Sequence, residues 1–134
     1  MASTLNPYLS FRGQAREALT FYESVFGGTA KVSTFGEFGG EGATADQVMH
    51  GQLDTPQGFT LMVSDTPEET SLTVGDNITV SLSGDDVDAL RGFWQQLSDG
   101  GQVAVPLEKQ MWGDEFGMCT DKFGVPWMVN ITSA

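Results

Sequence analysis

Apolar residues recur at three- and four-residue steps in two stretches of the chain, and this spacing predicts two amphipathic helices. The first helix is predicted over residues 14–26, with an apolar face made of Ala15, Ala18, Leu19, Tyr22, Val25 and Phe26. The second is predicted to start at an N-cap, Asp85 or Asp86, with an apolar face made of Val87, Leu90, Phe93, Trp94 and Leu97. A glycine pair, Gly27-Gly28 or Gly100-Gly101, follows each helix and is predicted to end it.

Shorter apolar stretches, bounded by turn-forming residues, predict β-strands in both halves of the chain. In the N-terminal half the predicted strands are 5–11, 29–35, 48–54 and 59–64. In the C-terminal half they are 77–83, 102–106, 116–120 and 125–131. The glycine-rich segment 36–42 is predicted to be a flexible loop, and a second loop is predicted to run from the sixth strand to about Trp112.

The order of these elements repeats, and so does part of the sequence that carries them. The segment from Ser10 to Leu19 returns as the segment from Ser81 to Leu90, with serine, glycine, alanine and leucine at matching positions. A repeat of this length constrains the whole fold. We therefore predict an α+β protein of two tandem βαβββ units that form a cupped mixed sheet, with unit one at 1–66, a linker at 67–75 and unit two at 76–134. A ligand-binding cleft is predicted between the two half-sheets.

Two predicted three-residue turns, 56–58 and 122–124, set the register of the hairpins and so decide which side chains share a face. In the first hairpin, the residues predicted to face the helix are Leu53, Phe59, Leu61 and Val63. In the second, they are Cys119, Val125, Trp127 and Val129. The opposite faces are predicted to line the cleft with His50, Gln52, Met62, Phe116, Met118, Met128 and Asn130.

His50 is the only histidine of the chain and the one side chain expected to titrate near neutral pH. We predict two alternatives for it: a proton-transfer group with Asp114 as partner, or a histidine held within the hairpin wall without a catalytic role. Asp114 is predicted to lie at the rim of the cleft, either as that partner or as a solvated loop charge. Trp112 is a candidate for stacking on a ligand, together with Phe116.

The length and net charge of the chain limit the classes of molecule that it is expected to bind. The chain has 134 residues, enough for one compact domain, and a net charge of −12. Such a charge repels phosphate backbones and anionic lipids, so we expect neither nucleic-acid nor membrane partners. The single cysteine, Cys119, excludes an internal disulfide and is predicted to be a small buried residue. No signal peptide or membrane-spanning stretch is recognisable, so a cytoplasmic location is expected.

Three stretches resemble the vicinal oxygen chelate superfamily, which includes glyoxalase I, extradiol dioxygenases and bleomycin-resistance proteins. They are residues 6–28, residues 48–53 and residues 112–127, the last of which includes Trp112-Gly113-Asp114-Glu115-Phe116-Gly117-Met118. Together they are most similar to the PhnB-like, or glyoxalase-like, branch, and the resemblance covers essentially the whole chain. It implies a homodimer that binds a small molecule.

The resemblance also implies four metal-ligand positions, one in the first and one in the last strand of each unit. They fall at Pro7 or Tyr8, Met62, Thr79 or Ile78, and Met128. None carries the carboxylate or imidazole that hard divalent cations require, so we predict no metal and no cofactor. Three functions stay open: a binding protein, a metal-independent enzyme that uses His50, and a lyase or dioxygenase whose metal site is displaced. The resemblance does not decide whether the protein is an enzyme.

Overall fold

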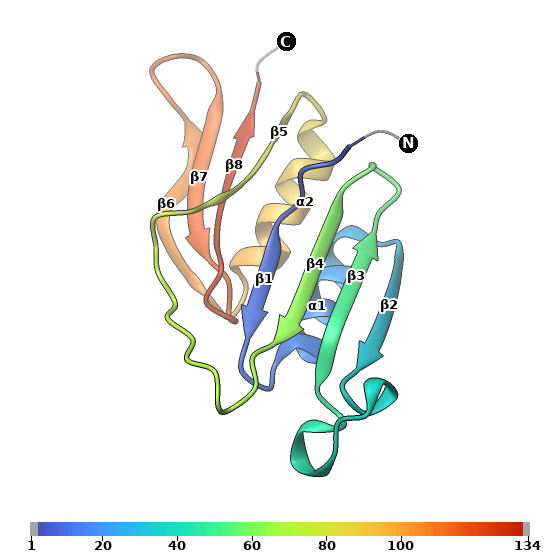
Figure 1. Ribbon diagram of the computed structural model, residues 1–134. Helices are drawn as coiled ribbons and strands as arrows, with labels where there is room; N and C mark the ends of the chain where they lie inside the picture. The colour runs from blue at the N-terminus through green and yellow to red at the C-terminus, as the bar shows by residue number, and fades with distance from the viewer. Residues whose placement is uncertain (1–2, 133–134) are drawn as a thin grey trace. The chain divides into compact units, whose positions relative to one another are not determined.

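The computed structural model describes residues 3–132 and contains eight strands and two helices (Figure 1). The helices are α1 (Ala15–Phe26) and α2 (Val87–Ser98). The strands of the first half are β1 (Tyr8–Phe11), β2 (Thr29–Thr34), β3 (Val48–Asp54) and β4 (Thr60–Asp65). Those of the second half are β5 (Val80–Gly84), β6 (Gln102–Lys109), β7 (Glu115–Thr120) and β8 (Pro126–Ile131). In this part of the chain no helix is long and apolar enough to cross a membrane.

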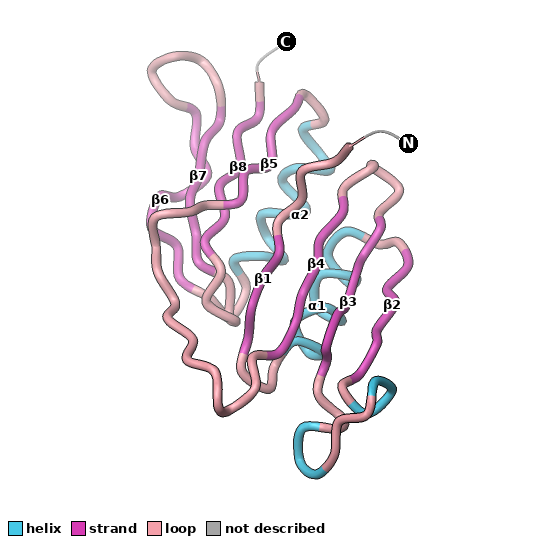
Figure 2. The backbone as a smooth tube through the Cα atoms, in the orientation of Figure 1, coloured by secondary structure: helices cyan, strands magenta, loops and turns pink. Residues whose placement is uncertain are grey.

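The chain divides into two compact units after Thr73, and the two units have the same topology. The strand order is β1-β4-β3-β2 in unit one and β5-β8-β7-β6 in unit two. In each sheet the first strand runs parallel to the last, and the other neighbours are antiparallel. One helix contacts one face of each sheet (Figure 2). The predicted α+β class and the tandem βαβββ arrangement are confirmed.

The helix α1 buries the whole apolar face that its spacing predicts, and α2 buries three of the five predicted residues. In α1 every predicted residue of the face is buried, and the ring of Phe26 meets Phe59 edge-on at 6.0 Å. In α2 the buried residues are Leu90, Phe93 and Leu97, whereas Val87 and Trp94 are only partly covered. The hydrophobic core of each unit is therefore the layer between its helix and its sheet.

The N-termini of the two helices are capped in different ways. The carboxylate of Asp86 accepts a hydrogen bond from the backbone N–H of Ala89 (3.2 Å), which is an ordinary N-cap. Gln14, at the start of α1, makes no such bond. Instead Asp65, only 4% exposed, accepts from the N–H of Ala15 (3.0 Å) through Oδ1 and from the N–H of Val48 (2.9 Å) through Oδ2. One carboxylate at the end of β4 thus fixes both the start of α1 and the start of β3.

The registers of both hairpins follow the three-residue turns. Leu53 pairs with Leu61 and Gln52 with Met62 in unit one, and Cys119 pairs with Trp127 in unit two. Leu53, Leu61 and Val63 are buried under α1, and Cys119, Trp127 and Val129 are buried under α2. The predicted facing of both hairpins is therefore correct.

The strand ends differ from the prediction most at three places, one of which is the fifth strand, which begins at Val80 and not at Asn77. The first strand begins at Tyr8 and not at Leu5, whose side chain is fully exposed and has nothing to pack against. The sixth strand runs to Lys109, well past the predicted end at residue 106. Pro106 is tolerated there because β6 is an edge strand, where a missing N–H need not break a ladder bond. The pairing of β6 with β7 is irregular on both sides of Val105.

The glycine-rich segment after β2 contains two short 3-10 turns, η1 (Gly36–Phe38) and η2 (Gly42–Thr44). Thr34 and Glu37 form a reciprocal capping box at its start. The N–H of Thr34 donates to Glu37 Oε2 (3.1 Å), and the N–H of Glu37 donates to Thr34 Oγ1 (3.3 Å). This segment holds the side chain of Phe38 67% exposed.

Candidate functional site

The predicted site residues of unit one lie together on the face of the sheet opposite α1. His50 and Gln52 are alternate residues of β3, and Gln52 pairs with Met62 on β4. Tyr8 pairs with Met62 from the other side, and its ring lies 5.8 Å from that of His50 with a tilt of 46°. The ring of Tyr8 therefore joins His50 as part of this face, a contact that the sequence did not predict.

Asp54 organises the polar end of the same face. Its Oδ2 accepts a hydrogen bond from Nε2 of Gln52 (3.1 Å), and its Oδ1 accepts one from Oγ1 of Thr60 (2.9 Å). These bonds hold the amide of Gln52 along the strand. Gln52 thus has a fixed orientation before any ligand binds.

The predicted site residues of unit two lie on the face of its sheet opposite α2. Met118 pairs with Met128, and Phe116 pairs with Asn130, which places all four side chains on one side. Asn130 Nδ2 donates to Asp114 Oδ2 (3.0 Å), so Asp114 also belongs to this side. We call these residues, together with Trp112, the unit-two face.

Trp112 lies in the turn between β6 and β7, and its ring meets Phe116 at 5.9 Å with an interplanar angle of 63°. The structure therefore brings together every predicted residue of unit two. His50 and Asp114 belong to different units. Their pairing for proton transfer stays a prediction.

The positions that correspond to metal ligands in the superfamily do not fit a hard cation. Tyr8 lies opposite Met62, and Ser81, not Thr79, lies opposite Met128. The parallel register of β5 and β8 causes that difference from the prediction. Phenol, hydroxyl and thioether groups make a poor ligand set for Mg²⁺, Mn²⁺ or Zn²⁺. Within residues 3–132, no group of three His, Cys, Asp or Glu side chains could hold a metal ion.

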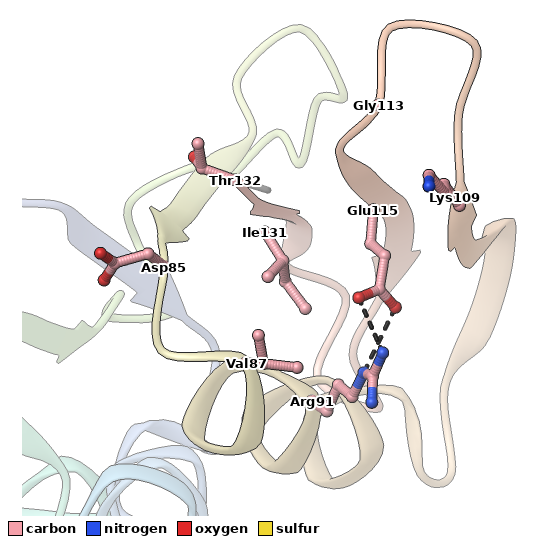
Figure 3. Close-up of a pocket in the computed structure, with 8 residues that line it drawn as sticks. All are labelled: Asp85, Val87, Arg91, Lys109, Gly113, Glu115, Ile131 and Thr132. Atoms are coloured by element: carbon pink, nitrogen blue, oxygen red, sulfur yellow. Dashed lines mark hydrogen bonds and ion pairs between the residues drawn. The ribbon is translucent and has the colours of Figure 1, made fainter. Parts of the chain in front are cut away.

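A pocket of about 330 Å³ lies elsewhere in unit two, against the first turn of α2 (Figure 3). Its lining residues are Asp85, Val87, Arg91, Lys109, Gly113, Glu115, Ile131 and Thr132. None of them is a predicted site residue. Arg91 reaches from α2 to Glu115 on β7, with Nη2–Oε2 at 2.8 Å and Nε–Oε1 at 3.2 Å. The hydrogen bonds with Glu115, and then its charge, raise the pKa of Arg91.

Cys119 lies under α2 and has no exposed reactive surface. Burial, and to a smaller extent the charge of Asp121, raises the pKa of the Cys119 thiol to about 11. The side chain is buried, as the sequence predicted. A nucleophilic role is disfavoured because the thiolate is the reactive form of cysteine.

Labelling of Cys119 with a disulfide reagent such as DTNB is expected to be slow in the folded protein. At pH 8 a thiol with a pKa of about 11 is only about one-thousandth thiolate, whereas an unfolded cysteine is roughly one-quarter thiolate. We expect labelling at pH 8 to be at least about 100-fold slower without denaturant than in 6 M guanidinium chloride. Equal rates in the two conditions would contradict the buried, protonated thiol.

Comparisons with known proteins give one family model and several similar proteins. The family model described as "Glyoxalase/Bleomycin resistance protein/Dioxygenase superfamily" matches residues 4–129. Protein YjdN of Escherichia coli is 27% identical over 95% of this chain and 94% of its own length. The crystal structure of protein PA1353 from Pseudomonas aeruginosa is 34% identical, with a TM-score of 0.88 over 99% of this chain and 100% of that one. The PhnB protein from Bacillus cereus is 23% identical, and its TM-score of 0.75 over 97% of this chain and 100% of that one shows the same fold.

Proposed function

Because the chain belongs to the glyoxalase/bleomycin resistance/dioxygenase superfamily, we propose that it binds a small, partly apolar molecule without the metal ligands usual in that superfamily. The binding surfaces are the sheet faces opposite α1 and α2. The observation that carries this proposal is the chemistry of those faces. They have Met62 beside Tyr8, and Met128 beside Ser81, where a metal-dependent relative would have its ligands.

The side chains on these faces suit binding more than metal chemistry. Thioethers and aromatic rings supply polarizable apolar surface, and the amides of Gln52 and Asn130 supply a few oriented polar groups. Hydrogen bonds to Asp54 and Asp114 already fix these two amides. A ligand would therefore lose little free energy in ordering the side chains that hold it. We also propose that the protein acts as a homodimer.

A second candidate is a metal-independent enzyme in which His50 transfers a proton. The observation that favours it is the position of the only imidazole of the chain, half-buried beside Tyr8 on the face where the ligand would bind. A neutral imidazole accepts a proton from a bound molecule and returns it at another atom. Asp114 is the proposed partner of His50 in this reaction.

A thermal-shift screen of small molecules, followed by NMR of each compound that stabilises the protein, separates the two candidates. We expect bound compounds to remain chemically unchanged, and His50→Ala to bind them within about threefold of the parent. Ser33→Ala is a matched control, because Ser33 pairs with His50 across β2 and β3. Turnover that His50→Ala abolishes and Ser33→Ala keeps would establish the enzyme in place of the binding protein.

Metal content gives an independent test. We expect less than about 0.1 metal ion per chain after purification, and no thermal stabilisation by Ni²⁺, Zn²⁺, Mn²⁺ or Mg²⁺, because the four positions carry no carboxylate or imidazole. Near-stoichiometric metal that resists dialysis would overturn this expectation. Loss of that metal in His50→Ala would then identify a displaced site with His50 as a ligand.

A further inference from the structure

The pocket beside α2 lies on the helix side of the unit-two sheet, away from the unit-two face (Figure 3). Ile131 of β8 lines the pocket, whereas the residue before it, Asn130, belongs to that face. Glu115 of β7 also lines it, and Arg91 reaches this carboxylate from α2. The volume of about 330 Å³ is near the lower end of the range for ligand pockets, about 300–1,000 Å³. The pocket therefore has room for a small molecule that is distinct from any ligand of the sheet faces.

The charged groups that line the pocket are two cations and two anions. Arg91 and Glu115 neutralise each other, because two parallel N–H···O bonds of 2.8 and 3.2 Å join them. The other two charged residues of the lining are Lys109 and Asp85. One positive and one negative group thus stay outside this ion pair and can meet a ligand.

Lys109 and Asp85 lie on opposite sides of the pocket (Figure 3). Lys109 is opposite Glu115 in the register of β6 and β7, so both side chains leave the sheet on the helix side. Asp85 precedes α2 but does not cap it, since Asp86 makes the capping bond. The carboxylate of Asp85 is turned outward in Figure 3, and because this side chain is exposed it can rotate toward a bound ammonium group.

Apolar side chains separate these two charges. Val87, the first residue of α2, and Ile131 lie between Asp85 and Lys109 in Figure 3. Ile131 is 2% exposed and is therefore held in place by the core. Methylene groups laid over these two side chains would be removed from water, which favours binding. A matching ligand has a positive end, an apolar middle and a negative end.

From this arrangement we infer that the pocket binds a linear ω-amino acid. Its carboxylate lies at Lys109, its ammonium group lies at Asp85, and its methylene chain covers Val87 and Ile131. A molecule without net charge also meets less repulsion than an anion from a protein whose net charge is −12. An α-amino acid fits less well, because its two charges lie side by side and cannot serve both sides of the pocket. This site would bind its ligand whether or not the sheet faces bind theirs.

The test compares ε-aminohexanoate with norleucine, an isomer whose two charged groups are adjacent, by NMR titration at low ionic strength. We expect ε-aminohexanoate to bind about fivefold more tightly than norleucine, hexanoate or hexylamine, with the difference shrinking as salt is added. Binding should shift the methyl resonances of Val87 and Ile131. The same comparison with γ-aminobutanoate and ω-aminooctanoate, each against its own single-charge analogues, covers shorter and longer separations of the two charges.

Variants on the two sides of the pocket test each charge separately. Lys109→Gln and Asp85→Asn should each weaken binding of ε-aminohexanoate about threefold, because each removes one ion pair with the ligand. Lys109→Gln should leave hexylamine unaffected, and Asp85→Asn should not weaken hexanoate. Lys122→Gln, in the turn after β7, and Asp99→Asn, at the end of α2, remove the same charges elsewhere in unit two. Both of these matched controls should bind ε-aminohexanoate like the parent.

Three results would overturn the site. The first is that no length of ω-amino acid binds more tightly than its single-charge analogues, or that none binds at all, which leaves the proposal for the sheet faces unaffected. The second is unchanged affinity in both Lys109→Gln and Asp85→Asn. The third is a set of shifts confined to the methyl groups of Met118 and Met128, which would move the amino acid to the unit-two face and support the proposed binding function instead.

Discussion

Replacing Asp121 with alanine is expected to lower the free energy of unfolding by about 3–5 kcal/mol, because three hydrogen-bond donors lose one buried acceptor. Asp121 is 3% exposed. Its Oδ1 accepts from the N–H groups of Phe123 (2.8 Å) and Val125 (3.1 Å), and its Oδ2 accepts from Nε1 of Trp127 (2.8 Å). The carboxylate thus holds the turn between β7 and β8 and orients the largest side chain of the core. Chemical denaturation of parent and variant measures the difference.

Asp121→Asn and Trp127→Phe make the test specific to these bonds. The asparagine keeps one oxygen for the backbone donors but presents an NH₂ group to Nε1 of Trp127. The free energy of unfolding of this variant should therefore lie between those of the parent and of the alanine variant. In a Trp127→Phe background that donor is gone, and Asp121→Asn should cost about 1–2 kcal/mol less than in the parent. Additive effects of the two substitutions would contradict the bond between the side chains.

Gly101→Ala is expected to lose about 3 kcal/mol of stability, which corresponds to about 10 °C in the midpoint of thermal unfolding. A β-carbon at Gly101 would overlap the carbonyl oxygen of Thr120 and lie 3.0 Å from the Cα of Asp121. Both groups belong to the backbone and cannot rotate away. The start of β6 and the end of β7 must therefore move apart to accommodate the methyl group.

Gly92→Ala is the matched control, since Gly92 lies within α2 and its added β-carbon would meet nothing within 4 Å. We expect that variant to gain about 0.5–1 kcal/mol through helix propensity. Gly28→Ala should repeat the loss in unit one, because its β-carbon would overlap the carbonyl oxygen of Asp54. A Gly101→Ala variant as stable as Gly92→Ala would show that the strands have room to move apart.

The glycine pairs illustrate what the sequence could and could not predict. Their position after each helix predicted where the helices end, which is correct. The second glycine of each pair is also required because a neighbouring strand passes too close for a β-carbon. That strand is distant in the sequence, so this requirement could not be predicted. The hairpin registers were predictable for the opposite reason: a three-residue turn fixes them locally.

The roles of the buried carboxylates Asp65 and Asp121 were not predicted, because their hydrogen bonds depend on the folded structure and not on a short sequence pattern. Asp65 accepts a hydrogen bond from Ala15, 50 residues earlier in the chain, and no sequence pattern around Gln14 predicts this bond. Asp121 lies beside its turn, but its bond to Trp127 depends on the direction of that side chain in the core.

The candidate site was predictable as far as each face, since alternation along a strand sorts side chains into two sides. Tyr8 was placed by the parallel pairing of β1 with β4, which has no short-range signal in the sequence. The turn that exposes Trp112 was not predicted, because β6 was predicted to end at residue 106 and not at Lys109. Its pattern, a glycine as the third residue of the turn, is the same as in the two hairpins that were predicted.

The two helix caps have a consequence for the order in which the chain acquires structure during synthesis on the ribosome. The residues of α2 emerge together with their cap, since Asp86 immediately precedes the helix. The residues of α1 emerge long before Asp65, and at about 5–20 residues per second the delay is roughly 3–10 s, against microseconds for helix formation. During that interval a twelve-residue helix without its cap is marginal in water. The parallel strand β1 must also wait for β4. The first unit of the nascent chain therefore closes in one late step, whereas the second can begin from its own helix.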